Sequence, residues 1–319
     1  MPAVPAARVL WSGIACVLVA VAAACTPSPA DPGPQPSDPL YRDPDTQVAD
    51  WVASHPSDAR TPVLRDRIAA RPQARWFTQA NPSTIAAEVR SYVGPAAASG
   101  AVPVLVPYAI PQRDCGGASD GGAAALSTWR AWVDAMAGAL GDTPAIVVLE
   151  PDALALEDCL SVAQRDARRA ALAAAVRSFA SAAPGTDVYL DAGHSAWHGA
   201  AEQARRLRAA GALDAAGFAT NVSNYRTTAD EVAYGRALIA ELGDPSLRQV
   251  IDTSRNGNGP AGTEWCDPAG RAIGRAPTLA TGEPTVAAYL WVKLPGEADG
   301  CAGAAGQFLP DLAYALATN

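Results

Sequence analysis

The sequence predicts a single α/β domain folded as a distorted (β/α) barrel of about seven parallel strands. Near-continuous apolar runs, typical of buried parallel strands, alternate with Ala-rich segments of helical period. Seven such units favour a closed, TIM-barrel-like arrangement over an open doubly wound sheet. No glycine-rich phosphate loop follows the first strand, which argues against a dinucleotide-binding fold. At 319 residues, one large core is expected and a second full domain is not.

The first 39 residues resemble targeting and spacer segments. Residues 1–25 are predicted to be a signal peptide, because Arg8 precedes an apolar stretch at 9–24 that is too short for a comfortable membrane span. The small residues before Cys25 resemble a bacterial lipoprotein cleavage box, although Ala22 stands where Leu is usual. Cys25 is therefore either acylated, which anchors the protein outside the cell membrane, or spare in a secreted protein. Residues 26–39 are a Pro-rich linker, and the folded domain is 40–319.

The expected elements alternate after a first helix at 43–54. Strands are expected at 74–79, 102–110, 145–151, 187–193, 217–223, 249–254 and 288–294. Helices are expected at 82–95, 122–140, 161–182, 200–210, 228–242 and 306–317.

Charge and cysteine usage restrict the partners and the compartment. The net charge is -8, from 24 basic and 32 acidic residues, and there is no basic cluster of the kind that binds a phosphate backbone. A nucleic-acid partner is therefore not expected, and we expect a monomer. Four cysteines lie in the folded domain and none has a CxxC or Cys/His zinc spacing, so neither a metal nor another cofactor is expected.

Those four cysteines suit an oxidising, extracellular compartment and allow three pairings. If each strand-end loop is tied to its nearest neighbour, the disulfides are Cys115–Cys159 and Cys266–Cys301. Loops of that size would each contribute roughly 4 kcal/mol on the chain-entropy estimate.

Polar side chains follow the strands of the predicted barrel. The carboxyl ends of parallel barrel strands form one rim, where enzymes of this architecture keep their chemistry. Lys293 is the only lysine in the chain, which makes its position after an apolar strand noteworthy. Several carboxylates on one rim favour general acid–base catalysis on a neutral substrate. In chain order the rim residues are Tyr108, Asp114, Glu150, Asp152, Asp191, His194, Asn221, Asn224, Asp252, Lys293, Glu297 and Asp299.

Six sequence blocks carry a family resemblance, in order from about Leu40 to the C-terminus. They are YAIPQRDCGGASDGG (108–122), VVLEPDAL (147–154), VYLDAGHSAW (188–197), ATNVSNY (219–225), EWCDPAGRAIG (264–274) and LWVKLPGEADGC (290–301). They resemble glycoside hydrolase family 6, the inverting β-1,4-glucanases that include endoglucanases and cellobiohydrolases. The resemblance implies a catalytic domain at 40–319, a barrel with fewer than eight strands, and the two disulfides above.

The resemblance also implies roles for three carboxylates. Asp152 matches the general acid, and Asp114 matches the aspartate that keeps this acid protonated and helps to hold the catalytic water. Asp299 matches the proposed base, although a water chain to Asp114 is an alternative proton acceptor. Burial and a nearby like charge both raise a carboxyl pKa. Inversion needs room for a water, so acid and base should lie roughly 6.5–9.5 Å apart.

The predicted substrate-binding residues combine aromatic platforms with hydrogen-bonding groups. The resemblance places Tyr108 against the reactive sugar, Ser119 on the catalytic water and Asp191 beside the reacting sugar. Trp265 and Trp197 match stacking platforms on the non-reducing and leaving-group sides, and Tyr41 is aligned with a further platform. The remaining predicted sugar contacts are Lys293, Glu297, His194, Asn221 and Asn224.

Departures from the family pattern favour an endo-acting β-1,4-glucanase with an open cleft. The loop GGASDGG is short, and Ala200 stands where some relatives have a second tryptophan. The alternatives are a cellobiohydrolase-type enzyme, a non-catalytic glucan-binding lipoprotein, and a metal-dependent hydrolase using Asp191, His194 and Asp252. With only three histidines in the chain, the metal-dependent alternative is weak.

Overall fold

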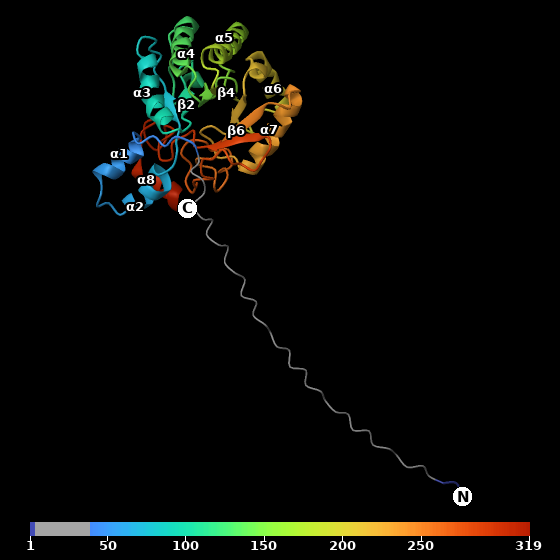
Figure 1. Cartoon of the computed structure of the whole chain (residues 1–319). Helices are drawn as coiled ribbons and strands as arrows, with labels where there is room; N and C mark the ends of the chain where they lie inside the picture. Colours follow the sequence, from blue (N-terminus) through green and yellow to red (C-terminus); the bar gives the residue numbers. More distant parts are fainter. Residues whose placement is uncertain (4–38) are drawn as a thin grey trace. The chain divides into compact units, whose positions relative to one another are not determined.

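The structure, a computed structural model, describes residues 1–3 and 39–319 (Figure 1). The predicted cleavage site, the acylation site Cys25 and nearly all of the predicted linker fall on residues 4–38 and lie outside the described residues. Within the described part of the chain, every helix is too short or too polar to span a bilayer.

Seven parallel strands form one curled sheet, as the sequence predicted. Each strand pairs with its neighbours in the chain, so the order in the sheet is the order in the sequence. The strands are β1 (Arg75–Phe77), β2 (Val104–Pro107), β3 (Ala145–Leu149), β4 (Thr186–Asp191), β5 (Gly217–Thr220), β6 (Arg248–Asp252) and β7 (Val286–Leu290).

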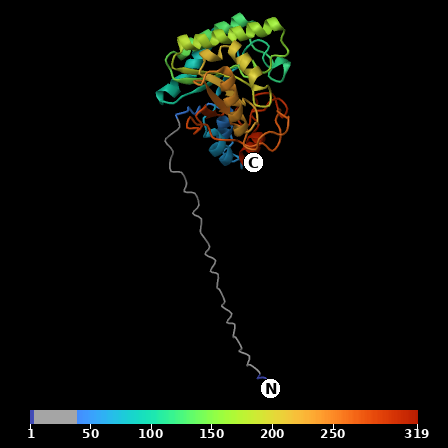
Figure 2. The same cartoon turned by 90° about the vertical axis from the view of Figure 1, so that its right-hand side faces the viewer.

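Helices α3 to α7 cover the outside of this sheet in chain order, whereas α8 packs against α2 (Figure 1). The long helix α5 crosses the outer surface (Figure 2), and its N-terminus is fixed by a capping box between Ser161 and Gln164. The helices are α1 (Gln47–Ser54), α2 (Thr61–Leu64), α3 (Ile85–Ala98), α4 (Leu126–Leu140), α5 (Val162–Ala182), α6 (Ala200–Ala209), α7 (Thr228–Leu242) and α8 (Pro310–Thr318). The sequence patterns missed α2 and the π-helical turn at Arg65–Ala69 that follows it.

Alternation along the strands divides the core into two clusters. Leu105, Val147 and Leu190 pack outward against the helices, while Val106, Val148 and Tyr189 pack together inside the barrel. Because both faces of the sheet are buried, the strands read as continuous apolar runs, which is why the sequence located all seven.

The barrel is distorted at the seam between β1 and β7. No β-ladder joins these two strands in the described residues. The Ala74 N–H donates to the Trp291 carbonyl at 3.0 Å, and the Trp76 indole N–H donates to the Val292 carbonyl at 2.8 Å. These contacts close the barrel locally in place of an eighth strand.

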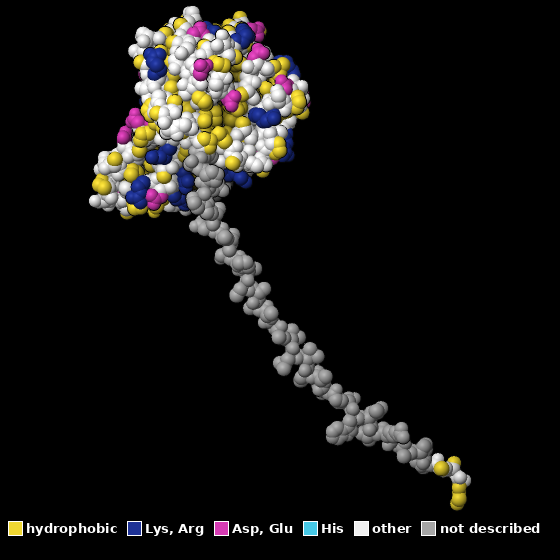
Figure 3. All heavy atoms as spheres, viewed as in Figure 1, with side chains coloured by type: hydrophobic (Ala, Val, Ile, Leu, Met, Phe, Trp, Pro, Cys, Tyr) yellow, Lys and Arg dark blue, Asp and Glu magenta, His cyan; other side chains and the backbone are white. Residues whose placement is uncertain are grey.

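Both predicted disulfides are confirmed. Cys115–Cys159 joins the loops after β2 and β3, and Cys266–Cys301 joins the loops after β6 and β7. Each closes a ring at the strand carboxyl ends, where the predicted site residues follow the strands. On the face shown in Figure 3, charged side chains of both signs are scattered between apolar and neutral areas.

Candidate active site

A cleft of about 1100 Å³ lies at the carboxyl ends of the strands. Parallel topology brings these ends to one rim, so residues far apart in the sequence meet there. Of the fourteen residues predicted to be catalytic or substrate-binding, eleven line this cleft: Tyr108, Asp114, Ser119, Asp152, His194, Trp197, Asn224, Trp265, Lys293, Glu297 and Asp299.

Asp152 lies in the loop after β3, with its backbone in the left-handed region at φ 67°. Its side chain is half-buried and lines the cleft. Burial raises the pKa of Asp152 well above its usual value, and the negative charges of Asp191, Asp114 and Asp299 raise it further. This environment favours a carboxyl that keeps its proton.

Asp114 lies across from this loop, in the turn after β2. The Ser119 N–H donates to Asp114 Oδ2 at 2.6 Å, which fixes the carboxylate and the GGAS loop together. A Cβ on Gly117 would come within 2.5 Å of Asp114 Oδ2, so a larger residue at this position would displace the carboxylate. The loop therefore presents a charge-bearing oxygen close to Asp152.

Asp299 has the opposite surroundings. Its Oδ2 accepts from Arg255 at 2.8 Å and from the Tyr225 hydroxyl at 3.2 Å, and its Oδ1 lies 3.2 Å from Lys293 Nζ. Burial acts to raise the pKa of Asp299, but the charges of Arg255 and Lys293 outweigh it, so the pKa lies below its usual value. Asp299 is therefore an anion held between two cations.

Glu297 lies at the same strand end as Lys293. The Gln47 side-chain amide donates to Glu297 Oε1 at 2.5 Å and to the Gly306 carbonyl at 2.8 Å. Burial raises the pKa of Glu297 to about 7, against the opposing effects of the Lys293 charge and the Gln47 hydrogen bond. Glu297 can therefore act as a hydrogen-bond donor or acceptor in the cleft near neutral pH.

His194 is neutral at pH 7, because burial, helped by the charges of Arg226 and His198, lowers its pKa to about 4. Its Nδ1 accepts from the Ala196 N–H at 3.2 Å. That contact leaves the proton on Nε2, as a hydrogen-bond donor. The His194 ring lies against Trp197, with centroids 5.3 Å apart.

Aromatic rings line the same cleft as Asp152. The Trp265 side chain is 54 % exposed, so a ring face is available for stacking. Trp197 provides a second ring, and Trp76, which the sequence analysis missed, packs edge-on against Tyr108 at 5.2 Å.

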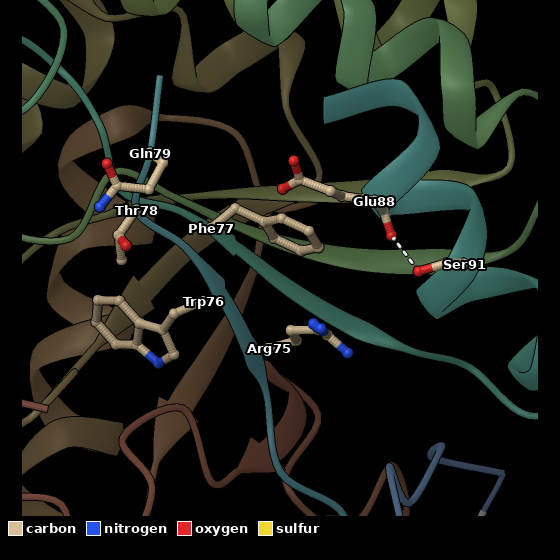
Figure 4. Close-up of a pocket in the computed structure, with 7 residues that line it drawn as sticks. All are labelled: Arg75, Trp76, Phe77, Thr78, Gln79, Glu88 and Ser91. Carbon is tan, nitrogen blue, oxygen red and sulfur yellow. Dashed lines mark hydrogen bonds between the residues drawn. The ribbon is translucent and has the colours of Figure 1, made fainter. Parts of the chain in front are cut away.

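A smaller hollow of about 190 Å³ adjoins the cleft beside β1 (Figure 4). It shares Arg75, Trp76, Thr78 and Gln79 with the cleft, and Phe77, Glu88 and Ser91 complete it. The cleft is thus bordered by hydrogen-bonding groups beyond Trp76.

Three predicted sugar contacts lie outside the cleft. Asp191 is 2 % exposed, and its Oδ2 accepts the backbone N–H groups of Asp152 and Gly193 at 2.9 and 3.1 Å. Asn221 is fully buried and bonds to main-chain atoms of Arg226 and Asp252.

Tyr41 packs edge-on against Tyr92, at 5.7 Å between ring centroids, and contacts the outer core cluster. Asp191, Asn221 and Tyr41 are not among the residues that line the cleft, and their predicted sugar contacts stay predictions.

The residues of the metal-dependent alternative are engaged elsewhere. The two carboxylate oxygens of Asp252 accept backbone N–H groups, including those of Lys293 at 2.9 Å and Ser254 at 2.9 Å. Asp191 is committed to the Asp152 loop in the same way. Across the described ranges, no group of three or more His, Cys, Asp or Glu residues is placed to hold a metal ion.

A parallel barrel whose rim carries a carboxyl with a raised pKa, a second carboxylate and indole rings in one cleft is typical of a glycoside hydrolase. The comparisons with known proteins agree. The chain belongs to glycoside hydrolase family 6, because the family described as "Glycosyl hydrolases family 6" matches residues 36–317.

Among its relatives, Endoglucanase A of Thermobispora bispora is 49% identical over 310 residues, covering 97% of this chain and 67% of that protein. Endoglucanase 1 of Streptomyces sp. (strain KSM-9) is 52% identical over 284 residues, covering 88% and 79%. The structure of the endoglucanase Cel6 from Mycobacterium tuberculosis, in complex with a methyl-cellobiosyl-4-deoxy-4-thio-β-D-cellobioside, superposes with a TM-score of 0.82 at 43% identity, covering 88% of this chain and 96% of that one.

Proposed function

We propose that this enzyme is an endo-β-1,4-glucanase that hydrolyses internal β-1,4-glucosidic bonds with inversion. The observation that carries the proposal is a cleft that holds Asp152, a carboxyl whose pKa is raised by burial and neighbouring carboxylates, together with the rings of Trp197 and Trp265. The relatives named endoglucanases are 49% and 52% identical to this chain, and one solved relative was determined with a cello-oligosaccharide analogue.

In the proposed mechanism Asp152 protonates the glycosidic oxygen as the bond breaks. The leaving sugar departs as a neutral alcohol, so the proton lowers the barrier by preventing alkoxide formation. Asp114 assists in two ways: its negative charge keeps Asp152 protonated, and its carboxylate can hold the attacking water together with Ser119.

The proton from the attacking water is proposed to pass toward Asp114 rather than to Asp299. Asp299 is a weak acceptor because Arg255 and Lys293 neutralise it and fill both of its oxygens. We assign to Asp299 and Lys293 the role of a charged pair that fixes the strand end beside the reacting sugar.

A neutral, hydroxyl-rich chain suits the remaining groups of the cleft. Trp265 and Trp197 offer ring faces for stacking, while Asn224 and His194 supply hydrogen bonds. Relatives named cellobiohydrolases match more distantly, at 32% identity over 237 residues, which favours endo over exo action.

We further propose that the enzyme acts outside the cell, as a monomer, either free or anchored through acylated Cys25. Support comes from the two disulfides, which persist in oxidising compartments.

Proton NMR of products from cello-oligosaccharides tests linkage, cleavage position and stereochemistry together. The proposal predicts that fresh α-anomers appear first, from internal bonds. Fresh β-anomers would contradict inversion, and release of cellobiose alone would favour the cellobiohydrolase alternative. If no new reducing ends form from carboxymethyl cellulose or cello-oligosaccharides, the non-catalytic alternative holds.

A further inference from the structure

One buried arginine connects the two loops that carry Asp114 and Asp152. Arg168 lies on α5 and is 3% exposed. Its Nη2 donates to the carbonyls of Pro111 and Gln112, at 2.7 and 3.1 Å, and its Nη1 donates to the Ala153 carbonyl at 3.2 Å. The first two carbonyls come shortly before Asp114, and the third belongs to the residue directly after Asp152.

Both loops need such support because their backbones are strained. Gln112, Asp114 and Cys115 have positive φ angles of 56°, 57° and 47° in the first loop. Glu150 and Asp152 have φ angles of 49° and 67° in the second. Non-glycine residues in this region persist only where surrounding contacts hold them, at a cost of order 1–3 kcal/mol each.

Two other sets of interactions connect the same two loops. At the base, Glu150 accepts the N–H groups of Ala109 and Ile110 and the indole N–H of Trp129. At the rim, the Cys115–Cys159 disulfide joins the same two loops. Of these three connections, the one made by Arg168 includes a hydrogen bond to the residue directly after Asp152.

We propose that Arg168 is a positioning residue that sets the separation of Asp114 and Asp152, and thereby the protonation of the acid. This inference rests on the proposed function. A guanidinium presents its donors in a rigid planar fork, so three carbonyls from two loops are held in one fixed geometry. Burial lowers the pKa of Arg168, and the neighbouring carboxylates Glu150 and Glu157 offset part of this effect.

The expected consequence follows from the groups around Asp152. The charges that face it are those of Asp191 from β4, Asp114 from the β2 loop and Asp299 beyond β7. If the two loops relax apart, the Asp114 charge moves away, so Asp152 loses its proton at a lower pH. The acid is needed in its protonated form, and the alkaline limb of the pH–rate profile then moves to lower pH.

The test is the pH dependence of kcat and kcat/KM of Arg168→Gln on a soluble β-glucan, measured with the full chain. We expect kcat to fall at least about tenfold, since misplacement of about 1 Å can cost up to about 10²-fold. KM should stay within about twofold because Arg168 does not line the cleft. Near-UV circular dichroism and thermal unfolding of each variant verify that it is folded.

Arg206→Gln is the matched control. Arg206 is also buried, at 7%, and donates from α6 to the carbonyls of Leu154 and Ala155, so it holds the loop of the acid alone. It should leave the alkaline limb in place even if stability falls. Arg177→Gln, on an exposed position of α5, controls for the loss of charge and helix propensity.

Arg168→Lys should restore part of the pH profile, because it keeps the charge but cannot span both loops with one planar fork. If Arg168→Gln does not fold, Arg168→Lys alone decides the question. An alkaline limb of its pH–rate profile that lies at lower pH than in wild type then supports the proposal. An alkaline limb unchanged in every folded Arg168 variant, or shifted equally in Arg206→Gln, overturns it. If wild type itself is inactive, the proposed function fails instead.

Discussion

Asp152 and Asp299 line one cleft but lie in opposite electrostatic surroundings. Around Asp152 there are other carboxylates and burial, so its pKa is raised. Around Asp299 there are two cations, Arg255 and Lys293, so its pKa is lowered. The difference shows how neighbours, rather than residue type, can raise the pKa of one carboxyl and lower that of another on a single rim.

The comparison also separates chemistry from architecture. The region after β2 and β3 has strained backbone and a carboxyl kept near a like charge, both of which cost stability. The region after β7 is compensated, because each oxygen of Asp299 has a cation beside it. This contrast supports the proposal that proton transfer takes place in the first region.

Asp152→Asn should have the largest effect, because it removes the acid from the first of the two regions. We expect kcat on soluble β-glucan to fall by about 10³-fold, because the amide cannot donate the proton that general acid catalysis requires. Reducing-end assays measure the loss, and calorimetry with cellotetraose should show affinity close to wild type. A wild-type rate on unactivated glucan would contradict the assignment of the acid.

Asp299→Asn tests the second region. Removing this anion leaves Arg255 and Lys293 as buried cations without their partner, so the free energy of unfolding should fall by about 3 kcal/mol. Chemical denaturation near pH 7 measures the change, and Asp45→Asn, an exposed carboxyl on the same cleft, is the control. Unchanged stability with lost turnover would instead support Asp299 as the catalytic base.

Asp114→Asn tests, through the pH–rate profile, whether neighbouring charge sets the pKa of Asp152. The substitution removes a negative charge that raises the pKa of Asp152, so that pKa falls and the alkaline limb of the pH–rate profile moves to lower pH. We also expect kcat to fall about 10²-fold, through weaker activation of the water. An alkaline limb that stays in place would show that Asp114 does not control the acid.

The smallest expected effect is at the edge of the cleft. Trp265→Ala should weaken cello-oligosaccharide binding by about 1 kcal/mol, roughly fivefold, because a stacking face is lost. Tyr314→Ala removes an exposed aromatic ring on α8 outside the cleft and should have no effect. Equal calorimetric affinities for both variants would exclude the platform role of Trp265.

The sequence predicted the strands, the disulfides and most of the cleft because parallel topology places every strand end on one rim. It could not separate polar residues that face the cleft from those that hold the backbone. Asp191 and Asn221 follow strands just as Asp152 does, yet they bond to main chain beneath it. Trp76 was missed because it lies within a short strand, and its exposure to the cleft depends on the seam with β7.

Arg255 shows a second limit of sequence reasoning. In a chain whose basic residues are nearly all arginine, one more arginine carries no signal. Its importance appears only when the fold brings it to 2.8 Å from Asp299, 44 positions away in the chain. Charge pairing of this kind decides the pKa of a site residue and is set by tertiary structure.

The central claim, that Asp152 donates the proton to the glycosidic oxygen, is tested most directly by changing the leaving group. Dinitrophenolate departs without protonation, whereas a sugar alkoxide does not. We predict that Asp152→Asn hydrolyses a 2,4-dinitrophenyl β-cello-oligosaccharide at close to the wild-type rate while losing about 10³-fold on cellotetraose. Equal losses on both substrates would contradict the account.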